Sequence, residues 1–249
     1  MTKIIFLGCL SRARYKQTCE NAIKLIKSID NEYKVFDDAP CCGALSFHIA
    51  NDNELKKHVD FVVNWFENNN ITDLVTICAG CYNYFTKYYP KFNKSFNIKI
   101  QHILQFLAEP ENLEKLDLKY SGKKLVIAYH DPCHLRTAKP KILKEPREII
   151  RKIQGNIILK EINHNPQVAL CCGAGGGVYS SFKENSDYNA YFILEQTKKQ
   201  RAKILLSSCP FCYTALRRIK EENKSIKIDI IKFEDFIYKI SEGVDPLNE

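Results

Sequence analysis

The 249-residue chain has no run that approaches the roughly 18 uncharged apolar residues that a membrane-spanning helix requires. Its first residues, Met1 to Gly8, hold too short an apolar stretch for a secretory signal peptide and fit a buried strand better. These absences predict a cytoplasmic protein without direct membrane insertion. In a reducing compartment, a recurrent cysteine pattern indicates metal binding or catalysis more often than disulfides.

Acidic residues are the scarcer charged type, since 29 Asp and Glu face 37 Lys and Arg, for a net charge of +8. The basic residues are spread along the chain and alternate with acidic ones, so we expect no nucleic-acid partner. The glycine-rich run at 173–177 lacks the order G-x-G-x-x-G and follows cysteines, so it is not a dinucleotide fingerprint. A positive balance suits a protein that holds thiolates and receives an acidic substrate or partner.

The chain is rich in cysteine, and one cysteine pattern occurs twice. A lone cysteine is followed by an adjacent pair with a glycine, and then by C-x-x-C. The spacing is Cys-x31-Cys-Cys-x35-Cys-x2-Cys in the first copy and Cys-x37-Cys-Cys-x36-Cys-x2-Cys in the second. Matching positions lie 124 to 131 residues apart, which indicates an internal duplication. The members are Cys9, Cys41, Cys42, Cys78 and Cys81 in the first copy, and Cys133, Cys171, Cys172, Cys209 and Cys212 in the second.

Strand and helix patterns alternate in both copies. The expected strands lie at 3–7, 33–36, 73–77, 125–129, 203–206 and 226–231, and the expected helices at 18–29, 53–68, 146–153, 188–199, 213–223 and 234–240. Most cysteine groups follow a strand directly, and parallel strands end at one edge of a sheet. The sequence therefore predicts an α/β fold of two pseudo-symmetric Rossmann-like lobes, 1–115 and 116–249. Parallel strands would carry flanking helices, and the two cysteine-bearing edges would face each other.

Five thiols in each lobe restrict the metal chemistry. Tetrahedral zinc uses four ligands and would leave one cysteine without a role, although zinc in one lobe stays an alternative. Iron–sulfur clusters prefer thiolates, and N–H hydrogen bonds to sulfur tune their potentials. Glycines beside the pairs, namely Gly43, Gly173, Gly175 and Gly176, are expected to let the backbone approach a bulky cluster without a Cβ clash. An ordinary cubane cluster needs four cysteine ligands, so five cysteines in each lobe indicate a different kind of cluster.

Several residues near the cysteines have two interpretations. His130 and His134 flank the first cysteine of the second copy. They are either structural histidines or proton donors to a leaving thiolate.

Three arginines follow the first cysteines, and two of them, Arg12 and Arg136, do so at the same distance of three residues; the third is Arg14. They are either solvated surface residues or a cationic rim that attracts an anionic thiol substrate or a negatively charged partner. Cys19 lies outside both copies and is expected in a helix core.

At these motifs the chain resembles the cysteine-rich CCG-domain proteins, whose best-described member is the B-type subunit of heterodisulfide reductase. The resemblance covers residues 4–236 and is carried by both CCG sets. The chain looks most like the D-type subunit at H-D-P-C-H-L (130–135), P-R-E (146–148), C-C-G-A-G-G-G (171–177) and S-C-P-F-C (208–212). The resemblance implies a non-cubane [4Fe–4S] cluster in each lobe, held by the five cysteines of that copy.

The resemblance also implies a function. The chain would be the iron–sulfur catalytic or electron-transfer subunit of a heterodisulfide-reductase-like complex, an oxidoreductase that reduces a small disulfide such as CoM-S-S-CoB to two thiols. Alternatives are the electron-relay subunit of a thiol:fumarate, glycolate or lactate oxidoreductase, and a zinc-stabilised scaffold. Proteins of the D type usually carry ferredoxin-like motifs that these 249 residues lack. A ferredoxin-like iron–sulfur subunit and a flavin-containing subunit are therefore the expected partners.

Overall fold

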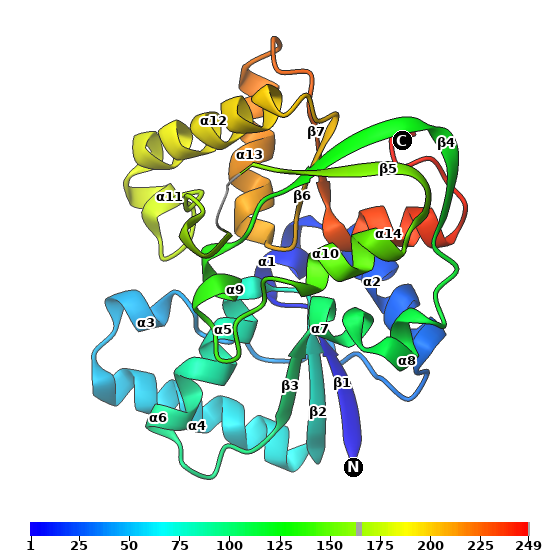
Figure 1. Ribbon diagram of the computed structural model, residues 1–249. Coiled ribbons are helices and arrows are strands. Elements are labelled where there is room, and N and C mark those ends of the chain that lie inside the picture. Colours follow the sequence, from blue (N-terminus) through cyan, green and yellow to red (C-terminus); the bar gives the residue numbers. More distant parts are fainter. Residues whose placement is uncertain (163–165, 249) are drawn as a thin grey trace.

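Two parallel β-sheets lie in opposite halves of the molecule (Figure 1). The computed structural model describes residues 1–162 and 166–248. The first sheet has the order β1 (Thr2–Phe6), β2 (Ile71–Thr76) and β3 (Lys99–His102). The second has the order β5 (Gln154–Glu161), β4 (Lys119–Tyr129), β6 (Ile204–Ser207) and β7 (Asp229–Lys232). All neighbouring strands are parallel, so the predicted α/β architecture of two lobes is confirmed.

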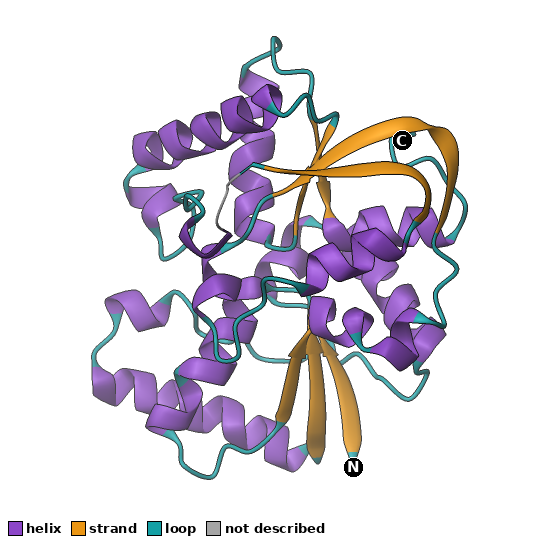
Figure 2. Ribbon diagram, in the orientation of Figure 1, coloured by secondary structure: helices purple, strands orange, loops and turns teal. Residues whose placement is uncertain are grey.

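Helices surround each sheet and fill the band between the two sheets (Figure 2). In the first lobe they are α1 (Cys9–Arg14), α2 (Lys16–Ile29), α3 (Ser46–Ile49), α4 (Asp52–Asn68), α5 (Ala79–Lys87), α6 (Tyr89–Phe92), α7 (Ile103–Ala108) and α8 (Pro110–Leu113). In the second lobe they are α9 (Cys133–Thr137), α10 (Glu145–Lys152), α11 (Val178–Ser181), α12 (Lys183–Lys199), α13 (Pro210–Glu222) and α14 (Phe233–Ser241). Within the described residues, no helix has the length and apolar character needed to cross a membrane.

The two lobes repeat one order of elements. β1, β2 and β3 correspond to β4, β6 and β7, and an isolated parallel bridge between Ile4 and Lys34 takes the place of β5. The prediction of a strand at 33–36 is therefore wrong, because the chain turns at Asp37 and Asp38 after this single bridge. Strands β3 and β5 were not predicted. Both lie at sheet edges, and β5 is half-buried or exposed along its length, so neither has the apolar run of a central strand.

One apolar core continues from one lobe into the other. Helix α14 of the second lobe packs on α2 of the first, and α7 of the first packs on α10 of the second. Ile5 and Val75, on one face of the first sheet, belong to this shared core, whereas Ile4 and Leu74 on the other face belong to a smaller core inside the first lobe. This interlock turns the carboxyl ends of both sheets toward the middle of the molecule (Figure 1).

Candidate metal centres

The first set of five cysteines meets at the carboxyl ends of β1 and β2. Cys9 begins α1 directly after β1, and Cys78 is the N-cap residue of α5, with Cys81 in its first turn. The Sγ atoms of Cys9 and Cys41 are 3.6 Å apart, and all five cysteines line one cavity. Cys42, Cys78 and Cys81 are buried, whereas Cys9 and Cys41 are exposed. The set therefore has a closed side and an open side.

The second set repeats this arrangement at the ends of β4 and β6. Cys133 begins α9, and Cys209 is the N-cap residue of α13. The Sγ atoms of Cys171 and Cys133 are 3.5 Å apart, and those of Cys172 and Cys212 are 3.1 Å apart. Cys172, Cys209 and Cys212 are buried, and the other two are partly exposed. The structure thus brings the ten predicted cysteines into two groups of five, with the same members on the closed side.

Backbone N–H groups point at the sulfur atoms in both sets. The N–H of Gly43 donates to Cys41 Sγ at 3.4 Å, and the N–H of Gly173 donates to Cys171 Sγ at the same distance. Backbone N–H groups at the start of α5 likewise donate to Cys78. Such donors stabilise thiolates and tune the potential of a cluster bound to them.

The cysteines of one set cannot all ionise by themselves. Hydrogen bonds from Cys42 and Cys9 lower the pKa of Cys41, while the bond to Cys41 raises the pKa of Cys9. Cys171 and Cys133 show the same opposition in the second set. Each new negative charge makes the next one harder to form. Five thiolates together therefore require a positively charged group among them, and this donor set fits a metal or an iron–sulfur cluster.

The glycines beside the pairs accommodate contacts within the protein. A Cβ on Gly43 would lie 2.5 Å from the His58 ring, and one on Gly173 would lie 2.9 Å from the backbone of Ser186 in α12. Their φ angles are +72° and +73°, which other residues rarely adopt. Their missing side chains thus serve a tight turn and its packing, and a role beside a cluster stays a prediction.

Gly8, which belongs to none of the predicted motifs, packs directly against two cysteines of the first set. Gly8 has a φ of +77°, and a Cβ there would lie 3.2 Å from both Cys78 Cβ and Cys81 Sγ. Its position, directly before the first cysteine and directly after a strand, is the sequence signal that could have identified it.

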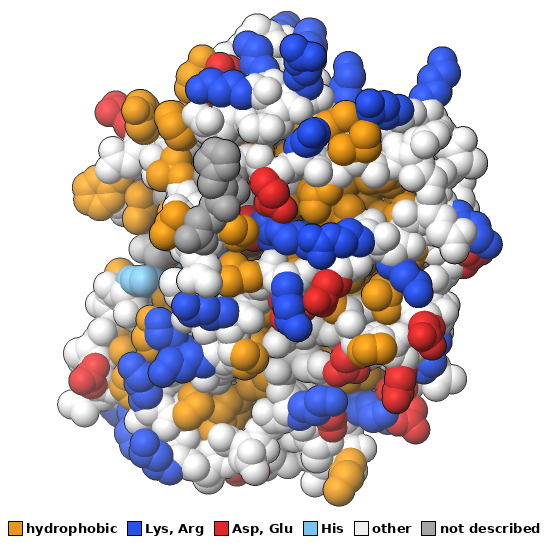
Figure 3. All heavy atoms as spheres, in the orientation of Figure 1, with side chains coloured by type: hydrophobic (Ala, Val, Ile, Leu, Met, Phe, Trp, Pro, Cys, Tyr) orange, Lys and Arg blue, Asp and Glu red, His pale blue; other side chains and the backbone are white. Residues whose placement is uncertain are grey.

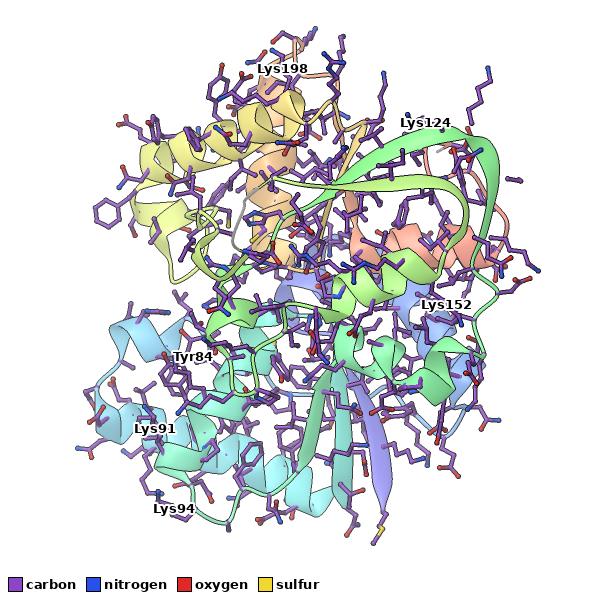
Figure 4. All side chains as sticks on the ribbon, viewed as in Figure 1. Tyr84, Lys91, Lys94, Lys124, Lys152 and Lys198 are labelled. Carbon is purple, nitrogen blue, oxygen red and sulfur yellow. The ribbon has the colours of Figure 1, made fainter. Side chains whose placement is uncertain are left out.

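The first set opens on the second lobe. His134, Gly176 and Phe211 of the second lobe line the cavity of the first set. The hydroxyl of Tyr84, labelled on α5 in Figure 4, is 2.5 Å from Nε2 of His48, and its ring lies 5.7 Å from that of His134. Burial lowers the pKa of His134. No sequence signal indicated His48 and Tyr84, because they act beside residues from the other half of the chain.

Gly175 and Gly176 allow this approach of the lobes. A Cβ on Gly175 would lie 3.4 Å from the His134 ring, and one on Gly176 would lie 3.2 Å from the ring of His48. Both glycines therefore accommodate imidazole rings at the junction between the cysteine sets.

His130 lies behind the second set. It is fully buried, and within the described part of the chain neither ring nitrogen has a hydrogen-bond partner. Burial lowers the pKa of His130 to about 4, so the ring is neutral near pH 7. A ring nitrogen and the Sγ atoms of Cys172 and Cys212 lie within 4.8 Å of one another. This trio could hold a metal ion through one nitrogen and two sulfur atoms.

The arginines after the first cysteines hold the loops that carry the adjacent pairs. Arg12 donates to the carbonyls of Ala39 and Asp37, just before the first pair. Arg136 donates to the Gln167 carbonyl at 2.6 Å, just before the second pair. Both arginines therefore position cysteines, a function that neither interpretation of the sequence included.

Comparison with known proteins identifies the family. The model of the cysteine-rich domain CCG matches residues 4–86 and again residues 127–217. The chain belongs to the CCG family. Each matched stretch contains one complete five-cysteine set, so the CCG protein carries the domain twice.

Several relatives of this CCG protein are iron–sulfur proteins or oxidoreductase subunits. An uncharacterized iron–sulfur protein of Methanocaldococcus jannaschii is 31% identical, over 94% of this chain and 46% of that protein. The B-type subunit of fumarate reductase (CoM/CoB) from Methanothermobacter marburgensis is 28% identical, over 94% and 46%. The D-type subunit of the dihydromethanophenazine:CoB–CoM heterodisulfide reductase from Methanosarcina barkeri is 28% identical, over 97% and 58%. The chain spans about half the length of these curated relatives.

Solved structures add only a distant likeness. Aspartate racemase of Picrophilus torridus aligns over 96% of this chain and 91% of its own at 14% identity, with a TM-score of 0.38. A score this low adds nothing to the description of the fold.

Proposed function

We propose that each cysteine set holds a non-cubane [4Fe–4S] cluster and that the pair reduces a low-molecular-weight disulfide, as in a heterodisulfide-reductase-like complex. The observation that carries this proposal is that the cavity of the first five-thiol set is lined by His134, Gly176 and Phe211 from the lobe that bears the second set. A small molecule at this junction would lie beside both sets. When bound, the clusters would supply the two electrons that break the S–S bond, and two protons complete the two thiols.

The donor set supports iron and sulfide over zinc. Five sulfur atoms exceed the four ligands of a tetrahedral zinc site in each lobe. The N–H donors on Cys41 and Cys171 are typical of iron–sulfur sites. The trio of His130, Cys172 and Cys212 is the observation that keeps zinc in the second lobe as a competing hypothesis.

His134 is our candidate for the proton donor. It lines the cavity of the first set and follows the first cysteine of the second, so it is near any molecule held between them. His130 is fully buried behind Cys172 and Cys212, and this position argues for a role inside the second set. The Tyr84 hydroxyl contacts His48 Nε2 and so orients His48 beside the same cavity.

The electrons would come from other subunits. We propose a ferredoxin-like iron–sulfur subunit and a flavin-containing subunit as partners, with a small anionic disulfide as substrate. The relation to the fumarate reductase (CoM/CoB) of Methanothermobacter marburgensis supports a second candidate, in which the clusters relay electrons and never contact substrate.

Thiol release from the anaerobically reconstituted protein separates these candidates. With reduced viologen as donor, we expect two thiols for every two electrons consumed from at least one small disulfide, quantified by bimane labelling and mass spectrometry. Cys19→Ala, outside both sets, should behave as the wild type, because Cys19 is buried in α2. Clusters that reduce and reoxidise without thiol release from any disulfide would favour the relay and contradict disulfide reduction.

A further inference from the structure

His48 and Tyr84 form a hydrogen-bonded pair that reaches from the surface to the cavity of the first cysteine set. The hydroxyl of Tyr84 lies 2.5 Å from Nε2 of His48, and both residues line that cavity. Tyr84 is 2% exposed, whereas His48 belongs to the exposed residues. The pair therefore joins the interior of the cavity to solvent through one hydrogen bond.

Packing holds the two side chains in this arrangement. The Tyr84 ring stacks on Tyr88 of the same helix at 4.9 Å, and its centroid lies 4.8 Å from that of Phe47. Phe47 directly precedes His48 in α3, so its contact with Tyr84 also positions His48. From the second lobe, Gly176 lies against the imidazole, where a Cβ would be 3.2 Å from Nε2 of His48. Both lobes thus position this ring.

The protonation state of His48 decides where the hydroxyl hydrogen of Tyr84 points. An unprotonated Nε2 accepts this hydrogen. A protonated imidazole carries hydrogen on both nitrogens, so Nε2 donates to the Tyr84 oxygen instead and leaves the hydroxyl hydrogen free for an acceptor in the cavity. A protonated His48 therefore presents a proton inside the cavity, although the imidazole itself lies at the surface.

The proposed reaction requires two protons, because a disulfide that takes up two electrons becomes two thiolates. His134 can supply one of them, since an imidazolium releases a single proton. We propose that His48 supplies the other through Tyr84. The Tyr84 hydroxyl gives its hydrogen to one thiolate, the Nε2 hydrogen of His48 replaces it, and water reprotonates His48. This inference rests on the proposed function, because it needs a disulfide that is reduced in the cavity.

The ionisable groups around the pair come from three elements. Helix α5 contributes Lys87 and Tyr88, α9 contributes His134, and the cavity contributes the cysteines of the first set. Burial is the main cause of the lowered pKa of His134, and the charges of His48 and Lys87 lower it further. Burial also raises the pKa of Tyr84, so its hydroxyl releases a hydrogen only when His48 replaces it. Protonation of His48 is therefore the step that pH controls.

Thiol release by the cluster-loaded protein, with reduced viologen as donor, tests this relay. Tyr84→Phe keeps the ring and should lower kcat about a hundredfold with little change in KM, which is the low end of what a positioned proton donor contributes. In the wild type, kcat should fall as the pH rises above neutrality, because imidazole loses its proton there, and Tyr84→Phe should flatten this decline. The control Tyr88→Phe removes the hydroxyl of the stacked ring, which makes no hydrogen bond to His48 within the described residues, and should retain the wild-type profile.

Rescue separates proton delivery from a structural role. His48→Ala should lose kcat by a similar factor and should regain a large part of it when imidazole is added, because free imidazole can occupy the vacated space. A loss that imidazole does not restore would mean that His48 only supports the packing of Tyr84, and it would overturn the relay. An unchanged kcat in Tyr84→Phe would overturn it as well.

A further measurement needs no turnover. Diethyl pyrocarbonate modifies unprotonated histidine nitrogens, and mass spectrometry identifies each modified site. Tyr84→Phe frees Nε2 of His48, so His48 should be modified several-fold faster than in the wild type, whereas Tyr88→Phe should not change the rate. Equal rates in wild type and Tyr84→Phe would overturn the relay. A wild-type protein that releases no thiol from any disulfide would instead overturn the proposed function, and this inference with it, even where the labelling shows the pair.

Discussion

Arg147 fixes the turn that carries Cys133. Its guanidinium group donates to both carboxylate oxygens of Asp131 at 2.8 and 2.9 Å, and to Glu161 at 2.7 and 2.6 Å. The side chains of Arg147 and Asp131 are 8% and 3% exposed. Because Asp131 lies two residues before Cys133, this buried pair ties the end of β4 to α10 and β5.

Replacement of Arg147 by Met should destabilise the metal-free protein by about 3–5 kcal/mol, because it leaves the Asp131 carboxylate buried without its partner. Urea unfolding measures this loss. The control Lys56→Met removes an exposed ion pair with Asp60 on α4 and should cost less than about 1 kcal/mol. A loss from Arg147→Met as small as that of the control would contradict the role of the buried pair.

At the residue scale, the residues that could be predicted best from the sequence are those that occur in both copies. The cysteines could be grouped because one residue type recurs at matched spacing in both copies. His48 and Tyr84 could not be predicted, because each contacts a partner that is distant in sequence or lies in the other lobe. A long-range contact leaves no periodic signal in a single sequence.

At the element scale, strands and turns place the sulfur atoms. Helix α4 was predicted to within a residue, because an apolar stripe runs along one face and three asparagines, 68–70, end it. The structure adds a capping box between Asn51 and Glu54 at its start. Strand β4 is longer than the predicted 125–129, since it begins at Lys119 with polar residues. The turn at Gly8, between β1 and α1, brings backbone against Cys78 and Cys81.

Gly8→Ala should lower the iron content by the amount that the first cysteine set binds, because the added Cβ would contact both Cys78 and Cys81. Gly243→Ala is the matched control, since Gly243 has a φ of +69° and nothing within 4 Å of the added atom. Both substitutions should cost on the order of 1 kcal/mol from backbone strain. Iron analysis of both variants is the measurement, and equal iron contents would contradict the role of the Gly8 turn.

At the scale of the whole molecule, the lobes are joined by their core. Basic side chains outnumber acidic ones on the face shown in Figure 3, in keeping with the net charge of +8. The shared core includes Phe236 of α14 and Leu25 of α2, which lie in different lobes. The two lobes could be predicted from the duplication. The packing of helices across the lobes could not, because the apolar periodicity of a helix predicts a buried face but not which helix packs against it. The boundary at residue 115 stays a prediction.

The shared core predicts one cooperative unfolding transition. Trp65, the single tryptophan, lies in the first lobe, so its fluorescence should follow the same urea curve as the far-UV circular dichroism of the whole chain. Phe236→Ala, in the second lobe, should shift both curves by about 3–5 kcal/mol. A Trp65 transition that this variant leaves unchanged would mean that the lobes unfold independently.

The most direct test of the paired clusters is elemental analysis of anaerobically purified protein for iron, acid-labile sulfide and zinc. Two [4Fe–4S] clusters predict about eight iron and about eight sulfide per chain. Cys42→Ala should lose about half of both, since it disrupts one of the two sets, whereas the equally buried Cys19→Ala should lose neither. Zinc without sulfide in the wild type, or a Cys42→Ala variant with the same iron content as the wild type, would contradict the account.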